Sequence, residues 1–412
     1  MFKGKMIHVI WSVLLSLPLI GFSAPHLQAS DGAVEDTGQA SGEKPFIMLL
    51  CKFPDIPDEQ HTVAYYQDIM DNTYPGLDHF WQENSYGKLT MAGNQVAGWF
   101  TLPERHSRYV KKNGSVNGAK LKEDCANAAD ADVYFPDFYG INWMFNGRLG
   151  GVNLFSSTVL SLDGVTKTYP GTVIGGSSDP RSHTMGSLAH EEGHIWGFPH
   201  SYGPYGDSYD SKWDVMSYGG SCDPYDPVYY CIPSHTIAKH KMDAGWISQD
   251  RVFYATPGLV QTVTIERHAL PTSNQDPLIA KVPIPHSKDF YTVESRKKAG
   301  YDIRIPGEAV VIHFKDHTQS GTLVVDPDGN GDPNDAGAMW LPGETFEDPA
   351  NGVSITVNSD TGTGYNVTFD VVDLGYPDFT ASDVSGPSTG AQGNLISVAS
   401  TICNFGSVDW ND

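Results

Sequence analysis

Basic residues are scarce in this chain of 412 residues. It carries 26 Lys and Arg residues against 49 Asp and Glu residues, which gives a formal net charge of -23 at pH 7. A protein that binds nucleic acid or an anionic membrane needs a basic surface, so this balance argues against both kinds of partner. The acidic excess suits a secreted protein, and one that binds divalent cations.

Cysteine is also scarce, and its number is odd. The five cysteines show no zinc-finger spacing: Cys51, Cys125, Cys222, Cys231 and Cys403. Cys222 and Cys231 flank a short loop, so they are the best candidates for a disulfide in a secreted chain, with two free thiols as the alternative. Cys51 lies within an apolar run, where we expect it to act as a small buried hydrophobic residue.

Long apolar segments are few, and the clearest is residues 7–22. Lys3 and Lys5 precede it, and the small residues Ser23, Ala24 and Ala29 follow it. This order predicts a secretory signal peptide at residues 1–29, followed by a polar linker at residues 30–44. A transmembrane anchor is the alternative, but the run is short for a span and no stop-transfer charges follow. We therefore expect secretion without stable membrane insertion.

The most informative stretch is residues 190–200, which reads HEEGHIWGFPH. His190 and His194 are four apart, so on a helix they point the same way and can hold one Zn²⁺. Gly197 can take the left-handed conformation that stops a helix, and the resulting turn can bring His200 back as a third ligand. Three protein ligands leave the fourth zinc position open for water, which is typical of a catalytic site.

Glu191 follows the first histidine of this stretch. It lies on the ligand side of the helix, where it can hold the water and take its proton. On the opposite side, Glu192 interrupts an otherwise apolar face. The alternative interpretation is a helix whose histidines merely lie in a polar patch.

The whole stretch resembles the signature of the metzincin zinc peptidases, HExxHxxGxxH followed by a methionine turn. Residues 213–220 read WDVMSYGG, and Met216 matches the methionine of that turn. The resemblance implies that Met216 forms an apolar floor beneath the metal. In astacins and serralysins a tyrosine two residues later ligates the zinc and then stabilises the tetrahedral intermediate, which implies the same for Tyr218. The alternative is that Tyr218 only packs within the turn.

Further passages resemble the immune inhibitor A family of secreted bacterial metallopeptidases. They include Asn84-Ser85-Tyr86-Gly87, Val96-Ala97-Gly98-Trp99 and Ala244-Gly245-Trp246-Ile247. The likeness covers most of residues 45–375, and one departure is His200, where many members have an aspartate. The family also implies a β-domain directly after the catalytic one, structural calcium, and an edge strand beside the cleft that pairs with extended substrate.

The apolar patterns predict an α+β protein. Residues 45–250 are interpreted as a metzincin-like catalytic domain, with a mixed sheet and an active-site helix, and residues 251–375 as an all-β sandwich. Residues 376–412 read as the start of a further, incomplete β segment. Predicted helices lie at 62–72, 76–84, 121–129 and 182–196, and predicted strands at 46–53, 140–146, 261–265, 353–357 and 365–371.

A second metal candidate is the acidic stretch at residues 326–335, DPDGNGDPND. Oxygen side chains at alternate positions, with glycine at the sixth, match the first half of a Ca²⁺ loop. The predicted ligands are Asp326, Asp328, Asn330 and Asp332. Gly337 stands where such a loop has its closing glutamate, so a solvated acidic turn is the alternative.

These patterns predict a secreted zinc-dependent endopeptidase that acts on protein or peptide substrates. Zn²⁺ would activate the attacking water, and Glu191 would pass the proton to the leaving amine. A secreted binding or adhesion protein that keeps the fold without hydrolysis is one alternative, and zinc hydrolysis of a non-protein bond is another.

Overall fold

The computed structural model describes residues 40–150, 154–176, 183–207, 209–217, 226–273 and 275–373, and the backbone alone of two strands beyond them. The predicted signal peptide and most of the predicted linker lie outside the described residues. Within the described part, the α-helices are α1 (Val63–Met70), α2 (Leu77–Asn84), α3 (His106–Tyr109), α4 (Gly118–Ala129), α5 (Met185–Ile195) and α6 (Ala238–Asp243). Short 3-10 helices lie at Phe135–Asp137, Gln249–Arg251, Gly300–Arg304 and Ala336–Ala338.

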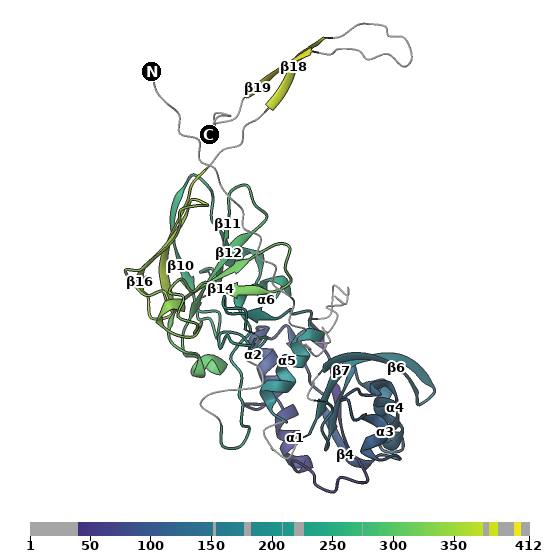
Figure 1. Ribbon diagram of the computed structural model, residues 1–412. Coiled ribbons are helices and arrows are strands. Elements are labelled where there is room, and N and C mark those ends of the chain that lie inside the picture. The colour runs from purple at the N-terminus through teal and green to yellow at the C-terminus, as the bar shows by residue number, and fades with distance from the viewer. Residues whose placement is uncertain are drawn as a thin grey trace, which may run out of the picture. The chain divides into compact units, whose positions relative to one another are not determined.

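The first half of the described chain is built on a five-stranded mixed sheet (Figure 1). Its strand order is β4-β2-β5-β7-β6, and only β6 runs antiparallel to its neighbour. The strands are β2 (Phe46–Lys52), β4 (Gln95–Thr101), β5 (Gly140–Phe145), β6 (Leu154–Leu162) and β7 (Val165–Gly175). A separate short parallel pair joins β1 (Gly42–Glu43) to β3 (Leu89–Thr90).

The internal strand β2 separates two apolar cores. Successive side chains of a strand point to opposite faces, and here Met48 and Leu50 pack with α1, α2 and α5, whereas Leu49 and Cys51 pack with α4. The predicted buried strand at 46–53 is therefore confirmed, and helices cover both faces of the sheet. The predicted helices at 62–72, 76–84, 121–129 and 182–196 correspond to α1, α2, α4 and α5.

One expectation for this core is wrong. Cys51 is not a free hydrophobic side chain, because it forms a disulfide with Cys125 of α4. Both residues are fully buried, so the bond ties strand β2 to helix α4, which covers that face of the sheet. Cys231 is also disulfide-bonded. Its predicted partner Cys222 lies outside the described residues, so that pairing stays a prediction.

The second half is dominated by two sheets that enclose a shared apolar core. Side chains such as Val293 and Ile312 of the six-stranded sheet meet Ile355 and Phe369 of the four-stranded sheet. The six-stranded order is β8 (Ser201–Tyr202), β14 (Thr322–Val324), β13 (Ala309–Lys315), β12 (Phe290–Arg296), β11 (Ile279–Pro283) and β9 (Val252–Tyr254). The four-stranded order is β10 (Val260–Glu266), β17 (Gly364–Val371), β16 (Val353–Asp360) and β15 (Thr345–Asp348). The prediction of an α+β protein with a late β-region is thus confirmed.

The six-stranded sheet is not made only of late residues. Strand β8 follows His200 directly and pairs in parallel with β14. On the face of β12 away from the shared core, Arg296 is fully buried and binds Asp302 through two nitrogens, at 3.0 and 2.8 Å. The same guanidinium donates to the carbonyl of Trp213 at 2.6 Å. The sheet therefore supports the segment that contains Met216.

Residues Asp36–Asp412 form one compact unit, and the predicted domain boundary near residue 250 stays a prediction. Beyond residue 373, strands β18 (Phe379–Ser385) and β19 (Ala399–Asn404) pair antiparallel. Among the described residues, no helix is both long and apolar enough to cross a membrane.

The disulfide generates a stability prediction. It closes a loop with a sequence separation of 74, and a cross-link of this kind stabilises by restricting the unfolded chain. Replacing both partners, Cys51→Ala with Cys125→Ala, should lower the free energy of unfolding by about 2–4 kcal/mol, measured in guanidinium chloride. A double variant within about 0.5 kcal/mol of the parent would contradict this contribution, since that range is typical of inconsequential substitutions.

Candidate metal centre

Helix α5 presents the first two histidines. Thr184 caps its start, with the side-chain oxygen accepting a hydrogen bond from Ser187 N at 3.1 Å. After its end, Gly197 has φ +88°, the left-handed conformation that the sequence predicted. Phe198 N then donates to Gly193 O at 2.9 Å, which closes the turn. The chain reverses and returns His200 to the helix.

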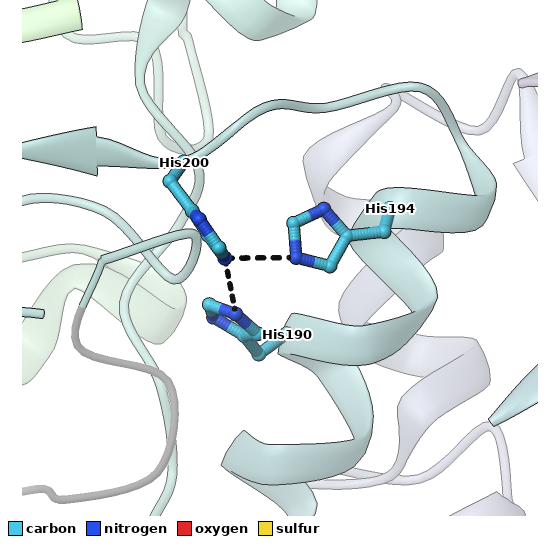
Figure 2. A group of neighbouring side chains, drawn as sticks. All are labelled: His190, His194 and His200. Carbon is cyan, nitrogen blue, oxygen red and sulfur yellow. Dashed lines mark hydrogen bonds between the residues drawn. The ribbon is translucent and has the colours of Figure 1, made fainter. Parts of the chain in front are cut away.

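Three imidazoles meet where this turn faces the helix (Figure 2). His200 Nε2 lies 3.2 Å from His190 Nε2 and 3.0 Å from His194 Nε2. The other ring nitrogens of the two helical histidines point away from this centre. His190 Nδ1 lies 2.8 Å from Val215 O, and His194 Nδ1 lies 2.8 Å from Phe198 O. A carbonyl can only accept, so both Nδ1 atoms carry the proton and both Nε2 lone pairs face the centre.

This arrangement fits a zinc ion. Tetrahedral Zn²⁺ with Zn–N bonds of about 2.0–2.1 Å sets its ligand nitrogens roughly 3.3 Å apart, close to the two separations observed. Zinc-bound histidines commonly donate their second N–H to a backbone carbonyl, as both helical histidines do here. Burial, and then the neighbouring imidazoles, lower the pKa of His190 to about 3 and that of His194 to about 4, so both rings are neutral near pH 7.

Glu191 follows His190 in α5 and is only 8% exposed. Burial raises the pKa of its carboxyl group to about 7, and a hydrogen bond from the backbone N–H of Phe155 acts in the opposite direction. A group that exchanges a proton near the working pH is suited to general acid–base chemistry.

Met216 is fully buried and packs in the core with residues of α5, and its role as an apolar floor beneath a metal stays a prediction. The contact depends on a residue that the sequence analysis did not identify. A Cβ at Gly193 would lie only 2.2 Å from Met216 Sδ, so only glycine leaves room for the thioether. The signal available in the sequence was a glycine in the middle of a helix, where it is otherwise unfavourable.

Asp214 holds the turn that contains Met216, and the sequence analysis did not identify it either. Its buried carboxylate accepts hydrogen bonds from Ser201 Oγ at 2.7 Å, Thr236 Oγ1 at 2.9 Å and Met216 N at 3.1 Å. Ser217 N donates to the Asp214 carbonyl at 3.0 Å and closes the turn. The turn is thereby fixed, and with it the Val215 carbonyl that orients His190.

Glu192, which interrupted the apolar face of the predicted helix, has a structural explanation. Its carboxyl group accepts from Trp81 Nε1 at 2.7 Å and from Asn142 Nδ2 at 2.8 Å. These bonds join α5 to α2 and to β5 inside the core. Because both oxygens are satisfied, the buried group anchors the helix against the sheet.

Strand β6 lies at the edge of the mixed sheet and borders the triad. The ring of Phe155 contacts His194, with ring centroids 5.0 Å apart, and its backbone N–H reaches Glu191. The sequence analysis expected an edge strand near the site without locating it, because the distance between a strand and a helix is set by tertiary packing.

A tyrosine also borders the triad, but it is not Tyr218, which lies outside the described residues. The ring of Tyr209 contacts His190 and His200, with centroids 5.5 and 5.2 Å apart. Burial, and then the charge of Glu191, raise the pKa of its phenol, so it keeps its proton at neutral pH.

The acidic stretch forms a second group of potential ligands. Carboxylate oxygens of Asp326, Asp328 and Asp335 lie within 4.8 Å of one another. Asn330 Nδ2 donates to Asp328 Oδ2 at 2.8 Å, so the predicted Asn330 borders the group. Asp332 is not part of this group. Its Oδ1 accepts a hydrogen bond from Asn334 N at 3.0 Å. Asp335, which was not predicted, stands in the group.

Two observations suit a cation at this group. Asp326 is 7% exposed, and its Oδ1 has no hydrogen-bond partner. A Cβ at Gly337 would lie 2.3 Å from that oxygen and 2.5 Å from Asp328 Oδ2, so the glycine keeps the space between the carboxylates open. A further group, formed by Asp289, Asp316 and His317, is more exposed and has its histidine bonded to Asp289 at 2.6 Å.

Comparisons with known proteins add little to this geometry. No protein-family model matches the sequence, and no curated protein matches it either. Among solved structures, one match is described as "Structure of a chaperone-substrate complex", with 14% sequence identity and a TM-score of 0.27. The match covers 49% of the present chain and 34% of the matched chain, so the present chain spans about a third of the length of the matched protein. A TM-score this low does not indicate a shared fold.

The contact between Gly193 and Met216 generates a prediction. Gly193→Ala should lower the free energy of unfolding by about 1–3 kcal/mol in urea, because the new methyl group displaces the buried thioether. Gly118→Ala is the matched control, since it also places alanine in a helix but meets no atom within 4 Å. The control should be neutral or stabilising by up to about 1 kcal/mol. Equal effects of the two substitutions would show that the Met216 contact does not constrain residue 193.

Proposed function

We propose that this protein is a secreted zinc-dependent endopeptidase of the metzincin type, similar to the immune inhibitor A family. One observation carries the proposal: three imidazoles whose Nε2 atoms meet at 3.0 and 3.2 Å. The carboxyl group of Glu191 borders them through Phe155, whose backbone N–H donates to it and whose ring contacts His194. Three imidazole nitrogen ligands and a general base are the components of a hydrolytic zinc site.

Each residue of the site has a role in this proposal. Zinc, when bound, supplies a polarised carbonyl and an activated water. His190, His194 and His200 hold the ion, and the first two are oriented by their bonds to Val215 O and Phe198 O. The Glu191 carboxylate accepts a proton from the attacking water and passes it to the leaving amine nitrogen.

Strand β6 is the element best suited to hold an extended peptide. In the part of the chain that the structure describes, no strand pairs with its outer edge, and Phe155 of this strand borders Glu191 and His194. Its side chains Leu154 and Val159 are 44% and 65% exposed. A substrate strand can add to such an edge by backbone hydrogen bonds, which are largely independent of side-chain identity. This arrangement supports protein and peptide substrates.

Casein hydrolysis by the purified chain tests the proposal. We expect cleavage that phenanthroline abolishes and added zinc restores. Zinc binding at one ion per chain without any cleavage of casein or gelatin would instead favour a binding or adhesion protein. Cleavage that is insensitive to zinc removal would contradict the metal-dependent mechanism.

The role of Glu191 gives a mutational prediction. Glu191→Ala should retain one zinc per chain in elemental analysis, because the carboxylate acts on the water and not on the metal. Its kcat should fall by about 10²–10⁴, the usual contribution of a general acid–base group. Glu123→Ala, which removes an exposed carboxylate from α4, should leave kcat unchanged. A zinc-replete Glu191→Ala variant with parental kcat would refute this mechanism.

We also propose that the group formed by Asp326, Asp328 and Asp335 binds a structural Ca²⁺. Calcium prefers six to eight oxygen ligands, and the unpartnered Asp326 Oδ1 with the neighbouring carboxylates offers part of such a set. A divalent cation would also offset the burial and like charges that raise the pKa of Asp326.

Calcium binding predicts a shift in stability by mass action. At a Ca²⁺ concentration of roughly 100 times Kd, the stabilisation should be about 2.7 kcal/mol, seen as a higher Tm by calorimetry. Asp328→Ala should abolish the rise. Asp316→Ala, which removes a carboxylate from the more exposed acidic group, should leave it intact. A parent Tm that does not respond to calcium would favour a solvated acidic turn.

A further inference from the structure

We propose that Tyr209 is the residue that stabilises the scissile carbonyl oxygen as negative charge develops on it. This inference rests on the proposed peptidase function and names a residue of the same site. The hydroxyl donates a hydrogen bond from Oη and keeps its proton throughout, while Glu191 carries the proton that moves. No bond of Tyr209 forms or breaks.

The ring contacts place Tyr209 at the metal centre. Its ring meets His190 at an interplanar angle of 63° and His200 at 79°, with the centroid separations given above. His194 is instead covered by Phe155. Tyr209 is nevertheless 49% exposed. The side chain thus touches two ligand histidines and still reaches the solvent through which a substrate must enter.

Other tyrosines near the site are less suited to this role. Tyr205 donates its hydroxyl to Asp326 Oδ2 at 2.7 Å, so it is committed to the acidic group. Tyr202, in strand β8, has its ring near that of His200, with centroids 6.0 Å apart, farther than the 5.2 Å between Tyr209 and His200.

The backbone at Tyr209 is strained, and its surroundings maintain the strain. Its φ of +62° is unusual for a bulky residue and commonly marks a functional position. The following residue, Asp210, is bound on two sides: its Oδ1 accepts from Gly203 N at 2.7 Å, and its carbonyl accepts from Asn334 Nδ2 at 2.7 Å. Asn334 Oδ1 also accepts from Lys212 N at 2.6 Å. These contacts hold the loop so that the ring stays against the histidines.

Tyr209→Phe tests the proposal, because it keeps the ring and removes only the hydroxyl. Removal of one donor to a developing oxyanion typically lowers kcat by about 10²–10³. We expect that fall with casein-derived peptides, with KM within about threefold of the parent value and zinc content and Tm unchanged. Tyr134→Phe is the matched control, since Tyr134 is 58% exposed and lies outside the site. Its kcat should equal that of the parent.

Equilibrium binding provides a readout without turnover. A phosphinic peptide carries a tetrahedral anionic group in place of the scissile amide, so it imitates the charge that Tyr209 is proposed to meet. Its Kd, measured by calorimetry, should rise by about 10²-fold in Tyr209→Phe. An ordinary peptide, measured in the Glu191→Ala background, should bind the chain equally well with and without the Tyr209 hydroxyl.

Three outcomes would overturn the assignment of Tyr209. The first is a kcat within about threefold of the parent, which is less than roughly 0.7 kcal/mol. The second is a rise in KM alone, which would make Tyr209 a substrate-binding residue. The third is a loss of phosphinic peptide affinity in Tyr218→Phe but not in Tyr209→Phe. A parent chain that neither cleaves casein nor binds the phosphinic peptide would instead overturn the peptidase function itself.

Discussion

The geometry of the triad depends on two hydrogen bonds that end on backbone carbonyls. The Nδ1–H groups of His190 and His194 donate to Val215 O and Phe198 O, and these bonds fix both the tautomer and the tilt of each ring. The position of a carbonyl is set by its backbone, so the orientation of the two imidazoles depends on the turns around residues 197 and 216. Neutral imidazoles with converging lone pairs are the result.

The β-region supports those turns from the other side. Arg296 donates to the carbonyl of Trp213 and is itself held by Asp302. Its charge is buried, and losing one member of such a group would leave the others without compensation in a low-dielectric interior. Asp214 bonds both Ser201, the first residue of β8, and the turn at Met216. The β-region is therefore part of the scaffold of the site.

The sequence predicted the parts of the site that are local in the chain. The four-residue spacing of His190 and His194 predicts that they share one face of a helix. Gly197 predicts the end of that helix, because glycine readily takes the left-handed conformation found there. The buried strands of the mixed sheet and the helices that pack on it were likewise predicted from their apolar periodicity. Phe155 and Tyr209 were not assigned to the site, because a strand and a loop reach the triad only through tertiary packing. No sequence pattern related Cys51 to Cys125. The acidic group contains Asp335 and not the predicted Asp332, because the conformation of the loop, which spacing does not determine, decides which carboxylates meet.

The pairing of β8 with β14 joins the third histidine to a much later part of the chain. His200 is followed at once by Ser201 and Tyr202, which pair with Thr322 and Leu323. While the protein is being synthesised, α5 therefore leaves the ribosome well before the strand that fixes the backbone beyond His200. The backbone beyond His200 thus gains its strand partner only once residues 322 and 323 have been made, whereas His190 and His194 are both presented by the single helix α5.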